Sequence, residues 1–113
     1  DCYKFTGKGL ENWDVSNVTD MSYMFNGCEN FDCNLSKWDT SRVKDMHSMF
    51  AGCEKFNCNL SNWDVSNVTN MSSMFYYCKN FDCDLSNWDV SKVKNMNYMF
   101  YGCDKMTIPN WYK

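Results

Sequence analysis

Cysteine is the residue type that carries most of the potential chemistry in this chain. The 113 residues include eight cysteines and a single histidine, His47. At this density cysteines form disulfides, bind a soft metal ion or pack as small apolar side chains. The sequence has no Cys-x-x-Cys spacing and no second histidine, so we expect no metal and no other cofactor.

The spacing of the cysteines indicates how they would pair. Seven of them fall into two series with a period of 25 residues, which are Cys28, Cys53, Cys78, Cys103 and Cys33, Cys58, Cys83. Bonds inside each repeat would leave Cys2 and Cys103 unpaired at opposite ends, whereas bonds between neighbouring repeats use every cysteine. We therefore predict the disulfides Cys2–Cys28, Cys33–Cys53, Cys58–Cys78 and Cys83–Cys103. Buried free thiols are the alternative.

The same period runs through the whole chain. The tetrapeptide Trp-Asp-Val/Thr-Ser begins at Trp13, Trp38, Trp63 and Trp88. A repeat of this length is typical of one supersecondary unit stacked on copies of itself. We expect a single repeat domain over residues 1–113. Its predicted parts are an irregular partial repeat at 1–12 and repeats at 13–37, 38–62, 63–87 and 88–112, the last of them degenerate.

Each repeat contains two patterns that predict secondary structure. In the second copy the apolar positions Val43, Met46, Met49, Phe50 and Cys53 have the spacing of one helical face. The segment 56–60 then alternates apolar and polar residues, as in a short strand with one buried side. We therefore predict an α/β repeat solenoid of about four units, each with a short strand, a turn and a short helix, in which disulfides join successive repeats.

The other repeated residues are expected to have structural roles. Repeated methionines and phenylalanines predict a core rather than a soft-metal or ligand site. We expect the tryptophans to stack half exposed along an edge, with glycan stacking as the alternative. The aspartates that follow them predict Asx turns, with calcium binding as the alternative. Outward strand positions give a candidate binding face made of Asp32, Asn34, Asn57, Asn59, Asp82 and Asp84.

Composition excludes several classes of function. The net charge of −3 without a basic stripe argues against a nucleic-acid partner. The sequence contains no run of 18 apolar residues, so we predict no membrane-spanning helix. A single histidine and no glycine-rich phosphate loop indicate a protein that is not an enzyme. Because the sequence starts at Asp1, we expect a processed or excised chain. Five Asn-x-Ser/Thr sequons give possible glycosylation sites at Asn17, Asn34, Asn59, Asn67 and Asn70.

From Trp13 to Asp104 the sequence resembles the repeat of BspA-like leucine-rich-repeat proteins of bacterial surfaces, with the pattern WDVSNVTNMSxMFxxC. The resemblance implies a leucine-rich-repeat-like solenoid, a surface location and a role in adhesion, and it implies no catalytic residue. This chain departs from the family pattern at Cys33, Cys58 and Cys83. The second cysteine series suggests a variant strengthened by disulfides.

These observations predict a non-catalytic repeat module, extracellular or on a cell surface, because disulfides form in oxidising compartments. Its expected role is adhesion or interaction with a protein or glycan. The alternative is a structural subunit of an extracellular fibre or surface layer, whose partners are copies of itself joined end to end.

Overall fold

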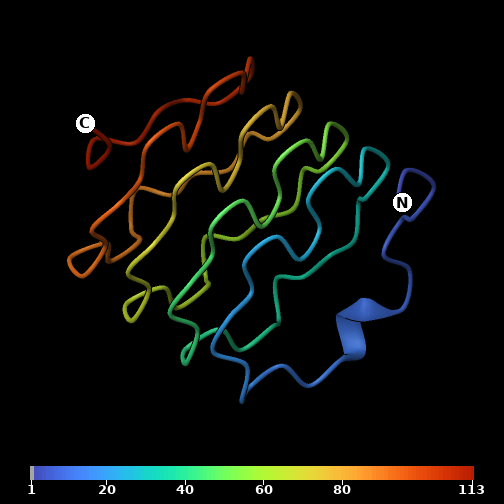
Figure 1. Ribbon diagram of the computed structural model, residues 1–113, viewed down its shortest axis with the longest axis horizontal. Helices are drawn as coiled ribbons and strands as arrows, with labels where there is room; N and C mark the ends of the chain where they lie inside the picture. Colours follow the sequence, from blue (N-terminus) through green and yellow to red (C-terminus); the bar gives the residue numbers. More distant parts are fainter. Residues whose placement is uncertain (1) are drawn as a thin grey trace.

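Successive repeats of the chain lie side by side in the computed structural model, which describes residues 2–113 (Figure 1). Equivalent residues of neighbouring repeats meet through isolated parallel bridges, which join Asp20 to Asp45, Asp45 to Asn70 and Asn70 to Asn95. The two chain ends lie at opposite ends of this stack of turns. The molecule measures 34 × 32 × 21 Å along its principal axes, so the turns form a compact body.

The predicted α/β repeat solenoid is wrong. Within residues 2–113 the one helix is the 3-10 helix η1, Leu10–Asn12, and no strand or sheet forms. Residues 47–52, expected to be helical, make consecutive tight turns. Residues 56–60, expected to be a strand, have the predicted alternation of buried and exposed side chains but no ladder partner. The protein is a compact globule of irregular turns.

Left-handed backbone conformations explain why the expected helix does not form. The third residue after each bridge residue has positive φ, with 60° at Tyr23, 53° at Ser48, 56° at Ser73 and 58° at Tyr98. A right-handed helix requires negative φ at every residue, so it cannot pass through such a position. The glycines at 27, 52 and 102 add a second positive φ of 78° in three of the repeats. The apolar spacing of a helix is therefore present without its hydrogen bonds.

The backbone bonds of this segment run between repeats and almost all point the same way. In the first repeat the N–H groups of Met21, Tyr23, Phe25 and Gly27 donate to carbonyls of the second repeat at 2.7–2.9 Å. The next two junctions reproduce this set of four bonds, from Met46, Ser48, Phe50, Gly52 and from Met71, Ser73, Phe75, Tyr77. We call these twelve bonds the backbone ladder. Beside it, each junction also has backbone bonds that run in reverse, for example from Lys44 N–H to the Thr19 carbonyl at 2.7 Å.

The core consists of stacked side chains from equivalent positions. One column contains Phe25, Phe50, Phe75 and Phe100, with ring centroids 5.7–5.8 Å apart. A parallel column contains Phe31, Phe56 and Phe81, at 5.6–5.8 Å. The methionines of the two middle repeats are fully buried beside them. The expectation that phenylalanines and methionines form the core is met at these positions, and Phe5 and Met24 are partly exposed at the first repeat.

The tryptophans differ from the expectation of a half-exposed edge. Trp38, Trp63 and Trp88 are buried, and their indole N–H groups donate to the carbonyls of Leu10, Leu35 and Leu60 at 2.9–3.0 Å. Trp13 is 58% exposed and makes no such bond, because no earlier leucine carbonyl of the described residues lies beneath it. Each buried indole therefore joins the start of one repeat to a leucine carbonyl 28 residues earlier in the chain.

We predict that Trp63→Phe lowers the free energy of unfolding by about 2 kcal/mol or more, because it leaves the buried Leu35 carbonyl without its donor and removes packed atoms. Trp13→Phe is the matched control and should change stability by less than about 0.5 kcal/mol. Urea denaturation of both variants measures the difference. Equal losses for the two variants would show that the buried indole bond does not hold the repeats together.

Candidate functional site

The candidate binding face is a polar surface over three repeats. Its six residues are all exposed in the structure: Asp32, Asn34, Asn57, Asn59, Asp82 and Asp84. In each repeat a buried cysteine lies between the two polar residues, and a buried phenylalanine and a buried leucine flank them. The alternation that predicted a strand therefore places these polar side chains correctly, although the sheet is absent.

Half of this polar face is fixed by its own backbone. The side-chain oxygens of Asn34, Asn59 and Asp84 accept the N–H of the serine two residues later, each at 3.0 Å. This Asx turn closes the corner before the next tryptophan. Asn57 accepts the backbone N–H of Asp82 at 3.1 Å and so connects two repeats.

Two carboxylates of the polar face, those of Asp32 and Asp82, have no intramolecular partner among the described residues. The carboxylates of Asp32 and Asp82 make no hydrogen bond or ion pair with any residue from 2 to 113. Open hollows of about 450 and 550 Å³ lie along the face, one around Asn57 and Asp82 and the other around Asp32 and Asn57. A third hollow of about 400 Å³ continues to Pro109. The face therefore offers unpaired acceptors beside shallow depressions.

The cysteines behind this face are hydrogen-bonded thiols. The sulfur of Cys58 accepts the N–H of Leu35 at 3.3 Å, and Cys83 does the same for Leu60. Cys33 has no earlier repeat of the same kind and donates to Glu11 Oε2 at 3.1 Å. Burial raises the pKa of Cys33 to about 11, and the thiol bond holds the pKa of Glu11 below its usual value. These thiols satisfy backbone groups that a sheet would otherwise pair.

The thiols of the other cysteine series form hydrogen bonds with backbone carbonyls. The thiols of Cys53, Cys78 and Cys103 donate to the carbonyls of the phenylalanines 28 residues earlier, at 2.9–3.1 Å. Burial raises the pKa of Cys53 to about 12 and that of Cys103 to about 11, and it raises the pKa of Cys78 as well. A thiol with such a pKa is a poor nucleophile near neutral pH.

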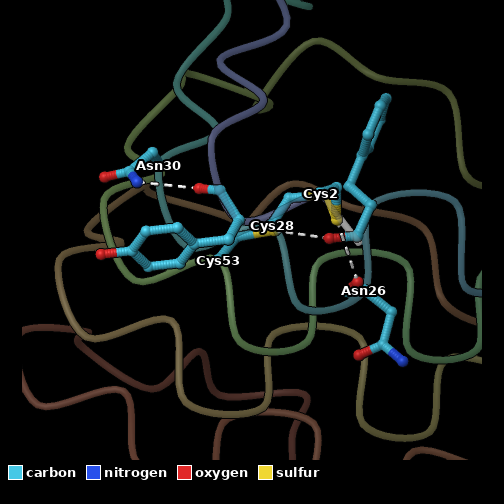
Figure 2. Close-up of a disulfide and its surroundings, with 7 residues drawn as sticks. Cys2, Asn26, Cys28, Asn30 and Cys53 are labelled. Carbon is cyan, nitrogen blue, oxygen red and sulfur yellow. Dashed lines mark hydrogen bonds between the residues drawn. A yellow bond between two sulfur atoms is a disulfide. The ribbon is translucent and has the colours of Figure 1, made fainter.

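One disulfide is present, between Cys2 and Cys28, with 4.9 Å between the Cα atoms (Figure 2). It ties the start of the described chain to the first repeat, where Asn30 also donates to the Tyr3 carbonyl. The predicted bonds Cys33–Cys53, Cys58–Cys78 and Cys83–Cys103 are not formed, and these six cysteines are free thiols. Each of these thiols is hydrogen-bonded to a backbone group or to Glu11 instead, so the predicted stapling of the repeats by these disulfides is wrong.

The possible glycosylation sites lie at or near the surface. Asn17, Asn34, Asn59 and Asn67 are exposed, and Asn70 is half-buried. Asn17 accepts a bond from Arg42 at 2.6 Å, and the Asn67 amide donates to the Ser41 carbonyl at 2.7 Å. These asparagines thus contact the equivalent corner of a neighbouring repeat, and their modification stays a prediction.

His47 contacts Ser72 of the following repeat. Its Nδ1 lies 2.9 Å from the Ser72 carbonyl oxygen and also contacts the Ser72 hydroxyl. In the tautomer that carries the proton on Nδ1, this nitrogen donates to the Ser72 carbonyl, while the Ser72 hydroxyl donates to Asn70 at 2.9 Å. In that tautomer Nδ1 does not accept the serine proton. The arrangement connects three side chains across two repeats.

The repeated aspartates close another corner of each repeat. Asp14, Asp39, Asp64 and Asp89 accept the backbone N–H of the serine two residues later, each at 3.0 Å. Bonds from the serine hydroxyl and this N–H hold the pKa of Asp14, Asp39 and Asp89 below the usual value. These contacts are the predicted Asx turns. Among the described residues no group of three His, Cys, Asp or Glu side chains is arranged to hold a metal.

Sequence reasoning missed an aromatic cluster formed by the exposed Tyr77, Tyr98 and Tyr101 and the half-buried Tyr76. Tyr77 takes a φ of 56° at the position that glycine holds in the other repeats, and its ring lies against Gly102, where a Cβ would come within 2.5 Å. The Tyr77 and Tyr101 ring centroids are 5.5 Å apart, and the Tyr101 phenol raises the pKa of Tyr77. The replacement of the repeated glycine by Tyr77 was the available signal.

We predict that the six free thiols react with iodoacetamide at pH 8 roughly 100-fold more slowly in the folded protein than in urea, since burial keeps them protonated. Peptide mapping without reduction should find Cys2 joined to Cys28. Urea-unfolded protein is the control for reagent quality. Rapid labelling of Cys78, or a peptide joining Cys33 to Cys53, would contradict the thiol arrangement.

Comparison with known proteins identifies the family of this chain. No helix within residues 2–113 is long and apolar enough to cross a membrane. Neither the curated proteins nor the solved structures contain a match to the chain. The family described as "Mycoplasma protein of unknown function, DUF285" matches residues 1–111, which is nearly the whole chain. The protein belongs to the DUF285 family.

Proposed function

We propose that the chain is a non-catalytic recognition module, extracellular or on a cell surface, whose polar face binds a protein or glycan. The observation that carries this proposal is the pair of carboxylates on Asp32 and Asp82, exposed beside open hollows and without an internal partner. Exposed acceptors of this kind are available to the hydroxyl and amide donors that glycans and proteins present.

The repetition of the face suits an extended partner. Asn57 and Asp82 occupy the same position in neighbouring repeats, joined by a backbone-to-side-chain bond. Paired backbone segments lie about 4.8 Å apart. A partner laid across the repeats would meet an acceptor at each step. Such an array gains affinity by adding contacts that are individually weak.

The family supports a surface location for this module. DUF285 is related to the BspA-like repeats, and the pattern from Trp13 to Asp104 resembles them. The thiol chemistry is compatible with an oxidising compartment even though six cysteines are free. These thiols are buried and have raised pKa values, so they present little thiolate to an oxidant.

We predict that the double variant Asp32→Ala/Asp82→Ala loses binding at least 10-fold, because each carboxylate supplies charge-assisted bonds to the partner. The probes are an array of immobilised glycans and three matrix proteins, namely collagen, laminin and fibronectin. The control is Glu29→Ala/Asp104→Ala, which removes the same charge outside the hollows of the polar face.

The control variant should bind like the unmodified chain. Equal loss in both double variants would mean that net charge, and not the polar face, controls binding. Absence of binding to every probe by the unmodified chain would count against the recognition role.

A further inference from the structure

One corner of the repeat changes character between the second and the third copy. The equivalent residue pairs at this corner are Asn26-Gly27, Ala51-Gly52, Tyr76-Tyr77 and Tyr101-Gly102. A Cβ at Gly27 would meet no atom within 4 Å outside its own chain neighbours, and a Cβ at Gly52 would meet only the Gly27 backbone, at 3.5 Å and 3.6 Å. The surface above these two glycines is therefore open, whereas the third repeat carries two aromatic rings at the same place.

A hollow of about 330 Å³ lies at this step between the repeats. Its lining includes Gly27, Ala51, Gly52, Tyr76 and Tyr77, so the small residues form a floor and the tyrosines form a wall. Paired backbone segments lie about 4.8 Å apart, so a floor of two repeats is roughly 10 Å wide. The volume falls within the range of small-ligand pockets, roughly 300–1,000 Å³. The hollow shares no lining residue with the hollows of the polar face.

The tyrosine wall is held in place by the repeat that follows it. The ring of Tyr76 stacks on Tyr101, with ring centroids 5.5 Å apart and an angle of 16° between the ring planes. The ring of Tyr77 lies against Gly102, where a Cβ would come within 2.5 Å of it. The two wall rings also meet edge to face, with centroids 4.6 Å apart. A surface that is fixed before a ligand arrives loses less conformational entropy on binding.

Polar groups at the edge of the hollow can both donate and accept hydrogen bonds. Glu54 lines the hollow, and its carboxylate lies 3.8 Å from the Lys79 ammonium, with both side chains about half exposed. An exposed ion pair of this kind is weak, so both groups can bond to a ligand as well. The exposed amide of Asn26 also lines the hollow, and it carries one acceptor and two donor hydrogens. The edge is therefore complementary to hydroxyl groups, which donate and accept in turn.

We propose that this hollow binds a pyranose unit of a neutral β-linked glucan, with a face of the sugar ring on Tyr76 and Tyr77 and its hydroxyls at Glu54 and Asn26. All ring hydroxyls of β-glucopyranose are equatorial, so both ring faces present C–H groups and the rim presents hydroxyls. An apolar side chain of a protein partner would also cover the tyrosines. It would desolvate Glu54 and Asn26 without giving them a hydrogen-bond partner, which costs free energy. This site does not depend on the polar face.

The repeat itself supplies variants that keep the fold. Tyr76→Ala/Tyr77→Gly gives the third repeat the Ala51-Gly52 corner of the second, and glycine adopts the positive φ of this position without strain. Tyr98→Ser is the matched control. It removes an exposed tyrosine of the same cluster that does not line the hollow, and Ser73 holds the equivalent position with a φ of 56°. Isothermal titration calorimetry with cellohexaose measures binding to the 113-residue chain.

The unmodified chain and Tyr98→Ser should bind cellohexaose with dissociation constants that agree within about twofold. The double tyrosine variant should bind roughly 10-fold more weakly or worse, because it loses the stacking surface. Cooperative urea denaturation of all three chains shows that they are folded. Asp32→Ala/Asp82→Ala should bind cellohexaose like the unmodified chain, so that failure of this site and failure of the polar face give different results.

Several results would overturn the proposal. An unmodified chain that does not bind cellohexaose at millimolar concentration would do so, and so would full binding by Tyr76→Ala/Tyr77→Gly. An equal loss in Tyr98→Ser would assign binding to the tyrosines in general and not to the hollow. Loss of cellohexaose binding in Asp32→Ala/Asp82→Ala would place the sugar on the polar face. If the tyrosine variant lost binding to collagen, laminin or fibronectin while cellohexaose bound to neither chain, the hollow would be a protein contact.

Discussion

The one-way backbone ladder is the constraint on which the rest of the structure depends. Twelve N–H groups, four at each junction, donate to carbonyls of the following repeat. Unpaired backbone groups are costly inside a protein, so each repeat requires the next one in fixed register. That register places the phenylalanine columns, the buried tryptophans and the thiols above one another. It also fixes which residues reach the polar face.

Short polar side chains replace regular secondary structure elsewhere in the chain. Asp14 and Asn34 close corners by accepting N–H groups two residues later, and their equivalents do so in later repeats. Cys53 and Cys58 satisfy a carbonyl and an N–H that no ladder reaches. A chain with almost no helix and no sheet thereby has no buried side-chain polar atom without a partner among the residues described.

The sequence predicted periodicity and burial better than backbone conformation. The 25-residue period correctly placed the buried residues around Met46 and Phe56 and the exposed residues Asn57 and Asn59. It could not reveal that Ser48 and Tyr23 adopt positive φ, because neither residue type signals it. The helical spacing of the apolar residues therefore predicted a helix that does not form. The cysteine series were recognised, but spacing alone cannot separate a disulfide from a thiol bonded to a backbone group.

For the candidate site, the alternation of apolar and polar residues was sufficient to predict which side chains form the polar face, and their charge was not. The polar face needs only that odd and even residues point to opposite sides, which an extended segment does with or without a sheet. The tyrosine cluster around Tyr77 depends on a glycine replacement in one repeat and on close packing against Gly102. Such a local exception is invisible to an argument from repeated positions.

Amide hydrogen exchange measured by NMR on a dilute monomeric sample tests the one-way ladder most directly. The account predicts slow exchange at Ser48, Phe50, Ser73 and Phe75, whose N–H groups donate to the next repeat, and fast exchange at Tyr98 and Gly102, whose N–H groups have no acceptor. Similar exchange rates at interior and last-repeat positions would contradict the ladder as the interaction that holds the repeats together.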